Sequence, residues 1–363
     1  MADSILALTV FVNDEEKKIC FYASGKDRNN SNAVASYLSA AMDAVFFQEF
    51  SRILNLYKKK FGQKSVPNMS LLLPDHLFLT DMLTIPNMGK KAAENSLGLV
   101  IGTVYKNKED LTYNTFPLQQ TKQTELYGLV GARKNLLQNF REVCAQNGFG
   151  LQNITFVSNA MADGAMSLNA KLRTATCLLL DIKESVSRFA FLNKGRTLGV
   201  FSLPFGTSAL RQTESVDESQ LFDYTSAKQL VQSATEKARA AETGEDEEIF
   251  AFPDAVAEEE SPAVRSENTP ADKADFLYEN FRIFVKWTLE LLAANEKITA
   301  LGSIDTVYVN LPVEYHFLLD KANAEQAENG VVFRPMLEDG ATPKILEMLG
   351  GLQVKQYNKL NNF

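Results

Sequence analysis

The chain has 363 residues, of which 45% are hydrophobic and 23% charged, and its formal net charge is −8 at pH 7. This composition is typical of a globular protein with two or three folded units, and the acidic balance without a basic stripe argues against nucleic acid as a partner. Three cysteines without a CxxC pair and only two histidines argue against a metal site and fit a reducing compartment.

The first part of the chain predicts strands around one long helix. Apolar residues recur at helical spacing from Asn32 to about Lys60, which predicts an amphipathic helix over that range. Short apolar runs bounded by polar turns or prolines predict four strands, at residues 5–12, 19–22, 69–74 and 77–85.

A compact unit of helices and strands follows. We expect one helix over residues 90–96 and another over residues 132–146, which Asn147-Gly148 ends. Between the two helices, apolar runs predict three strands, at residues 97–105, 111–117 and 125–131.

The middle of the chain predicts a β-meander. A short strand over residues 154–157 and a helix of small residues over 159–168 lead into it. The turn Asn193-Lys194-Gly195 has the residue types of a β-hairpin turn. The strands of the meander are expected at residues 176–182, 186–193 and 197–203.

An acidic segment interrupts the last part of the chain. Residues 241–260 contain nine acidic residues and no Lys or Arg, and three prolines punctuate the region. Such a segment buries too little apolar area to offset a backbone entropy cost of ~1–2 kcal/mol per residue, so we expect residues 243–272 to be a disordered insertion. Within it, the apolar cluster Ile249, Phe250 and Phe252 is either a short docking motif or a loosely packed loop.

Ordinary helix and strand patterns lie on both sides of that insertion. Helices are expected at residues 221–238, 275–295, 315–324 and 343–349. Strands are expected at residues 305–311 and 331–335. The alternation of strands and helices, with hairpins placed before helices, predicts an α/β protein with mixed sheets.

Three phrases in the sequence stand in the order and spacing of one known family. They are Leu72-Leu73-Pro74 with Pro86-Asn87-Met88, then Ala132-Arg133-Lys134 before a helix that ends at Asn147-Gly148-Phe149, then Asp181-Ile182 with Gly195-Arg196 and Leu203-Pro204-Phe205-Gly206. Asn159-Ala160-Met161-Ala162 holds the place of a small-residue helix between two lobes. Together they resemble the PilM family of type IV pilus assembly proteins, relatives of the cell-division protein FtsA.

This resemblance covers most of the chain and implies the actin-like ATPase fold. That fold is α/β, with two lobes built from duplicated RNase H-like subdomains whose mixed sheets are flanked by helices, and with a small α+β subdomain inserted in the first lobe. The implied ranges are 1–85 and 153–175 for the first lobe, 86–152 for the inserted subdomain and 176–363 for the second lobe, which contains the acidic insertion 243–272.

The resemblance also implies a nucleotide site, but a degenerate one. In this fold the glycine-rich turns of two hairpins let backbone N–H groups approach the phosphates, and an aspartate at each hairpin positions Mg²⁺. The residues that match the second hairpin are Asp181, Lys183, Ser185 and Gly206, with Lys183 where glycine is expected. The first hairpin has neither glycine nor aspartate before Asp14, and the place of the adenosine loop, residues 307–312, has no glycine. We therefore expect loss of tight ATP binding, no catalytic residue and no required cofactor, with ATP and Mg²⁺ as the alternative.

A peptide partner is the second implication of the resemblance. The family binds the cytoplasmic tail of an inner-membrane pilus protein in a groove between the first lobe and the inserted subdomain, where an extended peptide gains main-chain hydrogen bonds and side-chain pockets. The matching residues are Leu83, Ile85, Pro86, Met88, Leu126 and Leu129. The N-terminus is not basic and no long apolar run follows it, so we expect a cytoplasmic scaffold held at the inner membrane through this partner, with self-association left open.

Two other functions stay open. One is a working actin-like ATPase whose phosphate loops have diverged. The other is an FtsA-like division tether, although that family ends in an amphipathic membrane-binding helix and residues 356–363 are too polar and short for interfacial binding.

Overall fold

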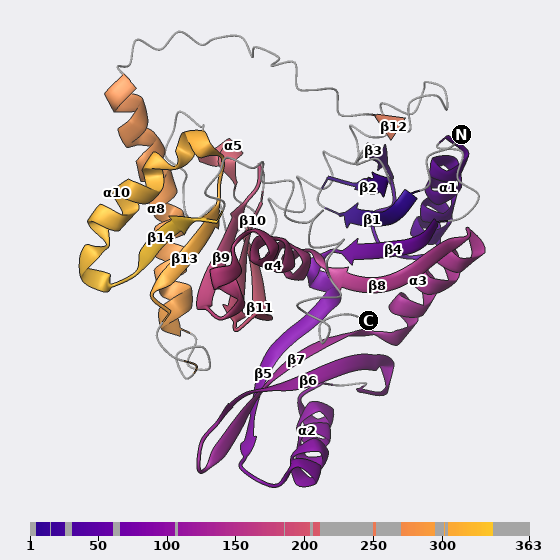
Figure 1. Cartoon of the computed structure of the whole chain (residues 1–363), viewed down its shortest axis with the longest axis horizontal. Helices are drawn as coiled ribbons and strands as arrows, with labels where there is room; N and C mark the ends of the chain where they lie inside the picture. Colours follow the sequence, from indigo (N-terminus) through magenta and orange to yellow (C-terminus); the bar gives the residue numbers. More distant parts are fainter. Residues whose placement is uncertain are drawn as a thin grey trace.

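The computed structural model of the chain places its strands in three sheets, of six, five and three strands (Figure 1). The residues that it describes are 5–14, 16–25, 31–60, 66–105, 108–184, 186–203, 206–210, 250–251, 270–294, 301 and 304–336. Within these ranges no helix is long and apolar enough to cross a membrane.

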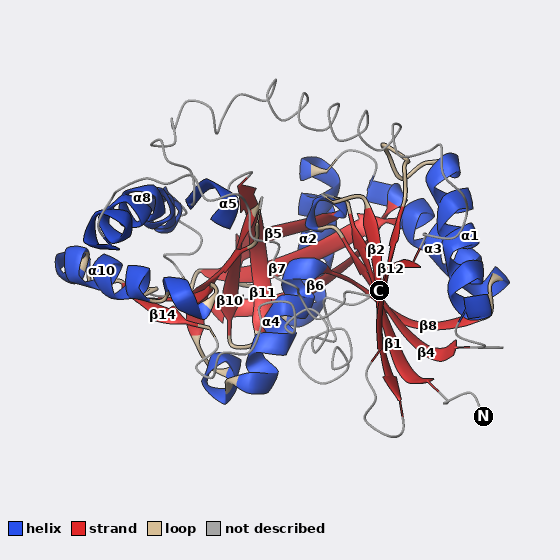
Figure 2. Cartoon of the chain, turned by 90° about the horizontal axis from the view of Figure 1, so that it is seen from above, coloured by secondary structure: helices blue, strands red, loops and turns tan. Residues whose placement is uncertain are grey.

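The six-stranded sheet contains most of the N-terminal strands, in the order β12-β3-β2-β1-β4-β8. Its strands are β1 (Ile5–Asn13), β2 (Lys18–Gly25), β3 (Ser31–Ser36), β4 (Val66–Leu73), β8 (Phe149–Phe156) and β12 (Phe250–Ala251). The helices α1 (Ala44–Lys60) and α3 (Lys134–Gln146) lie side by side against it (Figure 2). Buried aromatic rings of Phe46, Phe50 and Phe140 pack edge-on between these helices.

The helix expected from Asn32 onwards begins only at Ala44. Residues 31–36 instead form β3, which pairs with β2 in an antiparallel ladder. Ala33 and Ala35 are buried whereas Ser36 is exposed, so this stretch has the two-residue alternation of a strand. The helix starts where the Asp43 carboxylate accepts hydrogen bonds from the backbone N–H groups of Val45 and Phe46, at 3.0 and 3.1 Å.

The three-stranded sheet extends away from the two larger sheets and carries one helix (Figure 1). Its order is β5-β7-β6, all antiparallel: β5 (Phe78–Pro86), β7 (Thr124–Arg133) and β6 (Leu111–Gln120). The helix α2 (Lys90–Val104) packs on β5. This sheet spans residues 78–133, whereas the inserted subdomain was expected at residues 86–152. The helix α3 and the strand β8, which fall in the expected range, instead lie with the six-stranded sheet.

The strand expected at residues 97–105 is wrong, because α2 continues through it. Ala93, Leu97 and Ile101 are spaced by four residues and are all buried, which places them on one face of a helix. The buried side chains Leu83, Ile85 and Leu129 of the sheet complete this small core.

The five-stranded sheet has the order β11-β10-β9-β13-β14 and confirms the expected meander. Its strands are β9 (Thr176–Ile182), β10 (Ser187–Asn193), β11 (Arg196–Leu203), β13 (Thr306–Asn310) and β14 (Val332–Pro335), and its helices are α5 (Thr207–Leu210), α8 (Pro270–Ala294) and α10 (Phe317–Glu325). Lys194 and Gly195 both have positive φ, as a tight hairpin turn requires.

One buried helix, α4 (Val157–Leu168), contacts strands of both large sheets. Its small side chains let it pack closely, and all residues from Val157 to Met166 are buried. The expected helices at 221–238 and 343–349 lie outside the described residues, as does the insertion 243–272 apart from residues 250–251 and 270–272.

Candidate functional site

The candidate site lies where the turns of two hairpins meet a short 3₁₀ helix, η1 (Asp75–Leu77). This helix joins β4 to β5. Its residue Asp75 contacts the hairpin β9–β10, and its residue His76 approaches Asp14 at the turn of the hairpin β1–β2, with Nε2 3.9 Å from Asp14 Oδ2. Two consecutive residues of η1 therefore reach the two hairpins that the resemblance assigns to nucleotide phosphates.

Strand register brings three polar residues together on the five-stranded sheet. Arg188 on β10 is paired with Asp181 on β9, and Asp181 is paired with Asn310 on β13. Paired residues on neighbouring strands point to the same face of a sheet, so these three side chains form a row. Asn310 Nδ2 donates a hydrogen bond to Asp181 Oδ1 at 2.7 Å, and both residues are buried.

A single guanidinium connects two buried carboxylates in this row. Arg188 Nη1 lies 3.7 Å from Asp181 Oδ2, and Arg188 Nε lies 3.4 Å from Asp75 Oδ2. The Lys183 ammonium is 3.5 Å from the same oxygen of Asp181. Two carboxylates therefore meet two cations, and the cluster is close to electrically neutral without any added ion.

Asp75 is held by the start of α4 as well as by Arg188. Its Oδ1 accepts the backbone N–H of Ser158 at 2.9 Å, and its Oδ2 accepts the Ser158 hydroxyl at 2.7 Å. Burial raises the pKa of the Asp75 carboxyl above its usual range, against the opposing effects of Arg188 and the Ser158 hydrogen bonds. The nearby Asp181 carboxylate adds a smaller upward shift to the pKa of Asp75.

Gly206 is required by close packing against the turn of the β9–β10 hairpin. A Cβ atom at this position would lie 2.4 Å from the Lys183 carbonyl oxygen and 2.5 Å from that of Glu184. The next two backbone N–H groups, of Thr207 and Ser208, donate to these carbonyls at 2.8 and 2.9 Å. The N–H groups at the start of α5 are therefore already bonded to the hairpin turn.

The hairpin β1–β2 also has a carboxylate that protein groups bind, that of Asp14. Asp14 Oδ1 accepts from Lys17 Nζ at 2.7 Å and from the Tyr37 hydroxyl at 2.8 Å. Burial, then the charge of Asp14, raises the pKa of the Tyr37 hydroxyl, which stays a neutral donor. Asp14 thus ties its turn to the chain that follows β3.

Of the predicted phosphate-site residues, the structure brings Asp181, Lys183 and Gly206 together at one turn, while Ser185 lies outside the described residues. Cations of the protein itself lie beside the Asp181 carboxylate, where Mg²⁺ would need oxygen ligands that are free to bind it. Asp181 Oδ1 accepts from the Asn310 amide, whereas its Oδ2 is buried without a hydrogen bond and faces the Lys183 and Arg188 cations at 3.5 and 3.7 Å. The backbone donors near Gly206 are bonded to carbonyls. Among the described residues there is no group of three or more His, Cys, Asp or Glu side chains that could hold a metal ion.

Comparison with known proteins addresses the fold. No family model matches the sequence, and no curated protein matches it. A solved structure described as a "PilM-PilN type IV pilus biogenesis complex" matches with a TM-score of 0.54 and 13% identity, over 96% of this chain and 99% of that chain. This chain has the actin-like ATPase fold. The fold expected from the PilM resemblance is confirmed. We call the part of the chain built on the six-stranded sheet the first lobe and the part built on the five-stranded sheet the second lobe.

Two further solved structures match with lower TM-scores. The cytoplasmic domain of EpsL, an inner membrane component of the type II secretion system of Vibrio cholerae, has a TM-score of 0.37 and 13% identity over 58% of this chain and 77% of that chain. MreB5 of Spiroplasma citri bound to AMPPNP has a TM-score of 0.41 and 10% identity, over 97% of this chain and 96% of that chain.

Most of the residues expected to line a peptide groove lie inside the actin-like fold's small subdomain. Only Pro86 is exposed, and Met88 is half-buried. The other four are buried core residues that support the three-stranded sheet: Leu83, Ile85, Leu126 and Leu129. Of the expected groove residues, the ones that reach the surface are therefore Pro86, the last residue of β5, and Met88, which follows it.

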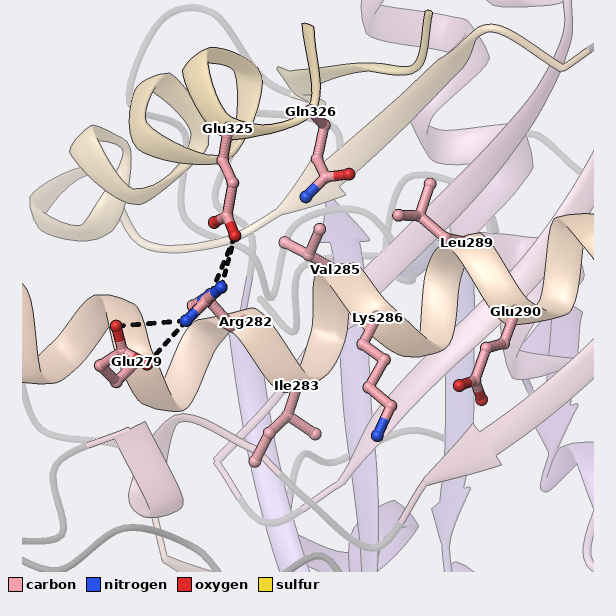
Figure 3. Close-up of a pocket in the computed structure, with 9 residues that line it drawn as sticks. All are labelled: Glu279, Arg282, Ile283, Val285, Lys286, Leu289, Glu290, Glu325 and Gln326. Carbon is pink, nitrogen blue, oxygen red and sulfur yellow. Dashed lines mark hydrogen bonds and ion pairs between the residues drawn. The ribbon is translucent and has the colours of Figure 1, made fainter. Parts of the chain in front are cut away.

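The second lobe carries a separate pocket of about 480 Å³ between α8 and α10 (Figure 3). Arg282 lies at its rim and pairs with Glu279 at 3.1 Å and with Glu325 at 2.6 Å. Apolar side chains of α8, including Val285 and Leu289, also line it. None of its lining residues belongs to either hairpin, so it is not the site that the resemblance implies for nucleotide.

Proposed function

We propose that this chain is a protein-binding scaffold of a type IV pilus or related secretion assembly, in which an internal ion-pair cluster has replaced the nucleotide site. The observation that carries the proposal is the position of Arg188, whose guanidinium lies within 4 Å of both Asp75 and Asp181. The guanidinium supplies a fixed positive charge where a nucleotide-binding member of the fold would use Mg²⁺.

The charge balance of the cluster supports this view. Mg²⁺ requires near-octahedral oxygen ligands and is usually bound through carboxylates that remain accessible to water. Asp181 is fully buried, and its oxygens already face Asn310, Lys183 and Arg188. Inserting a metal ion would bring a third cationic group against the same two carboxylates, which costs free energy by like-charge repulsion.

The fold supports a peptide-binding role. One solved structure with this fold over nearly the whole chain is a PilM–PilN type IV pilus biogenesis complex. We propose that the corresponding partner here is the cytoplasmic tail of an inner-membrane protein, bound as an extended peptide beside Pro86 and Met88 at the surface end of β5. The chain would then be cytoplasmic and held at the inner membrane through that tail.

Calorimetry tests the two parts of the proposal separately. Synthetic peptides covering the cytoplasmic tails of single-span proteins encoded beside this chain are titrated with and without ATP and Mg²⁺. We expect one tail to bind with the same Kd in both conditions, and Met88→Glu to weaken it at least ten-fold by placing a charge at the proposed contact. Glu142→Gln, on the exposed side of α3, is the matched surface control and should leave the Kd unchanged.

Nucleotide binding is measured on the same protein by thermal unfolding. The scaffold predicts no stabilisation by ATP and Mg²⁺. Stabilisation of ~2.7 kcal/mol at a hundred-fold excess over Kd would instead favour the working ATPase. Tail binding that occurs only with ATP and Mg²⁺ would contradict the scaffold directly.

A further inference from the structure

A buried carboxylate lies close to the surface end of β5. Glu125, the second residue of β7, is only 7% exposed. Strand register pairs it with Ile85 on β5 and with Gln120 on β6, so these three side chains point to the same face of the sheet. Ile85 packs with the buried residues of α2, which places Glu125 on the face that this helix covers.

Neutral groups hold both oxygens of this carboxylate. Its Oε1 accepts from the Gln120 amide and its Oε2 from the Tyr127 hydroxyl, each at 2.9 Å. Burial, then the hydrogen bond to Glu125 and its charge, raises the pKa of the Tyr127 hydroxyl, which therefore stays a neutral donor. Within the part of the chain that the structure describes, Glu125 forms no ion pair. Its negative charge is thus stabilised there by an amide and a hydroxyl.

A short hydrogen-bond network joins Glu125 to the proposed contact of the tail. Gln120 Nε2, which donates to Glu125, also donates to Asn87 Oδ1 at 3.1 Å. Asn87 stands between Pro86 and Met88, the two residues proposed to contact the tail. Both Asn87 and Gln120 are exposed, so the network reaches the surface at the place where the tail would lie.

The chemistry of this carboxylate fits a cation of the partner. An ionised carboxylate offers about four acceptor positions, of which Gln120 and Tyr127 use two. A hydrogen bond from an ionised donor is roughly twice as strong as one from a neutral donor, and the attraction between charges increases where the surroundings are less polar than water. Cytoplasmic segments next to a membrane span carry an excess of Lys and Arg. A cytoplasmic tail therefore has the type of residue that this position attracts.

We propose that Glu125 is the charge-recognition residue of the tail site, and that the tail presents a Lys or Arg to it while an apolar side chain of the tail contacts Met88. This role rests on the proposed peptide-binding function and specifies the chemistry of the partner. The exposed Gln120 amide turns aside for the incoming ammonium or guanidinium group, which then donates to Glu125 in its place. The Tyr127 hydroxyl keeps the carboxylate in position.

The test uses the full chain and a tail peptide that binds it in the calorimetric screen. Each Lys and Arg of the peptide is replaced in turn by Gln, and every peptide is titrated into the unaltered chain and into Glu125→Gln. We expect one peptide replacement and Glu125→Gln each to raise the Kd about ten-fold, and the two together to raise it no further, because both remove the same ion pair. Glu109→Gln changes an exposed carboxylate beside the opposite end of β6 and is the matched control, which should leave the Kd unchanged.

Two results would overturn the role of Glu125 while leaving the scaffold proposal intact. One is a tail that binds the unaltered chain with a Kd that no Lys or Arg replacement changes, a measurement that does not depend on the folding of any variant. The other is an equal Kd for the unaltered chain and for Glu125→Gln, with thermal unfolding showing that the variant is folded. If no tail binds the unaltered chain, the scaffold proposal and the role of Glu125 are both overturned.

Discussion

Arg188 on β10 lies 3.4 Å from Asp75 on η1, and this ion pair joins the second lobe to the first. Both side chains are almost completely buried. The pair lies next to the hairpin β9–β10, one of the two hairpins that the resemblance to the PilM family assigns to nucleotide phosphates. The contact therefore gives the lobes a fixed link that needs no ligand.

Removing Arg188 should strongly destabilise the protein. Arg188→Met leaves both Asp75 and Asp181 buried without the guanidinium that links them, with Lys183 beside Asp181 only. Breaking a buried ion pair by deleting one partner costs ~3–5 kcal/mol. Arg282→Met, which breaks pairs of a half-exposed arginine, is the control and should cost ~0–1 kcal/mol. Urea unfolding measures both. Equal losses in the two variants would show that the buried cluster has no special role.

Asp75 should make stability depend on pH in a defined direction. Because burial raises the pKa of Asp75 in the folded state, the folded protein binds a proton there in the window between the ordinary Asp value of 3.8 and the raised pKa. The unfolded chain does not, so this group's contribution to stability falls as pH rises through that window and is largest at its acidic end.

The substitution Asp75→Asn removes that titration. The stability of the unaltered protein relative to Asp75→Asn should increase as the pH is lowered from neutrality towards 4, as measured by urea midpoints at successive pH values. Glu279→Gln makes the same change in net charge at an exposed site and controls for long-range electrostatics. A stability difference that grows with rising pH would contradict the assigned direction.

Gly206→Ala should disturb the β9–β10 turn. The added Cβ would lie 2.4 Å from a backbone carbonyl oxygen, which a flexible side chain cannot relieve, so we expect a loss of ~1–3 kcal/mol, as for other overpacked sites. Gly199→Ala is the matched control, since its Cβ would meet only ordinary contacts at 3.7 Å and beyond. Thermal unfolding compares the two. Similar melting temperatures for both variants would rule out the close approach at Gly206.

Arg196 should fasten the small subdomain to the second lobe. Its guanidinium lies 4.9 Å from the Phe116 ring centroid, and its Nη1 donates to the Pro117 carbonyl at 3.1 Å. We expect Arg196→Ala to cost ~0.5–1 kcal/mol and to speed hydrogen exchange in β6. Lys194→Ala, in the preceding turn, should leave that exchange unchanged. Unaltered protection of β6 in Arg196→Ala would argue against this docking contact.

Helices and strands with a strong local pattern can be predicted from the sequence. The prediction fails where the spacing of the apolar residues fits both a helix and a strand. The meander from Thr176 to Leu203 has alternation and a hairpin turn that permit few alternatives. The apolar positions of residues 32–36 fit helical spacing as well as strand alternation, and pairing with β2 makes this stretch a strand. The apolar run at residues 97–105 is compatible with a strand, but its spacing also fits the buried face of α2, which the structure forms.

The alternation of strand and helix patterns was enough to predict an α/β chain, and the resemblance to the PilM family singled out Asp181, Lys183, Ser185 and Gly206. Neither revealed Arg188, Asp75 or Asn310 as their partners. Asn310 reaches Asp181 from a distant part of the chain, and Asp75 is linked to Asp181 only through Arg188. In the sequence, Arg188 is simply one polar residue within an apolar strand. Only strand register and the packing of the two lobes bring these charges together, since the free energy of an ion pair depends on distance and burial rather than on separation along the chain.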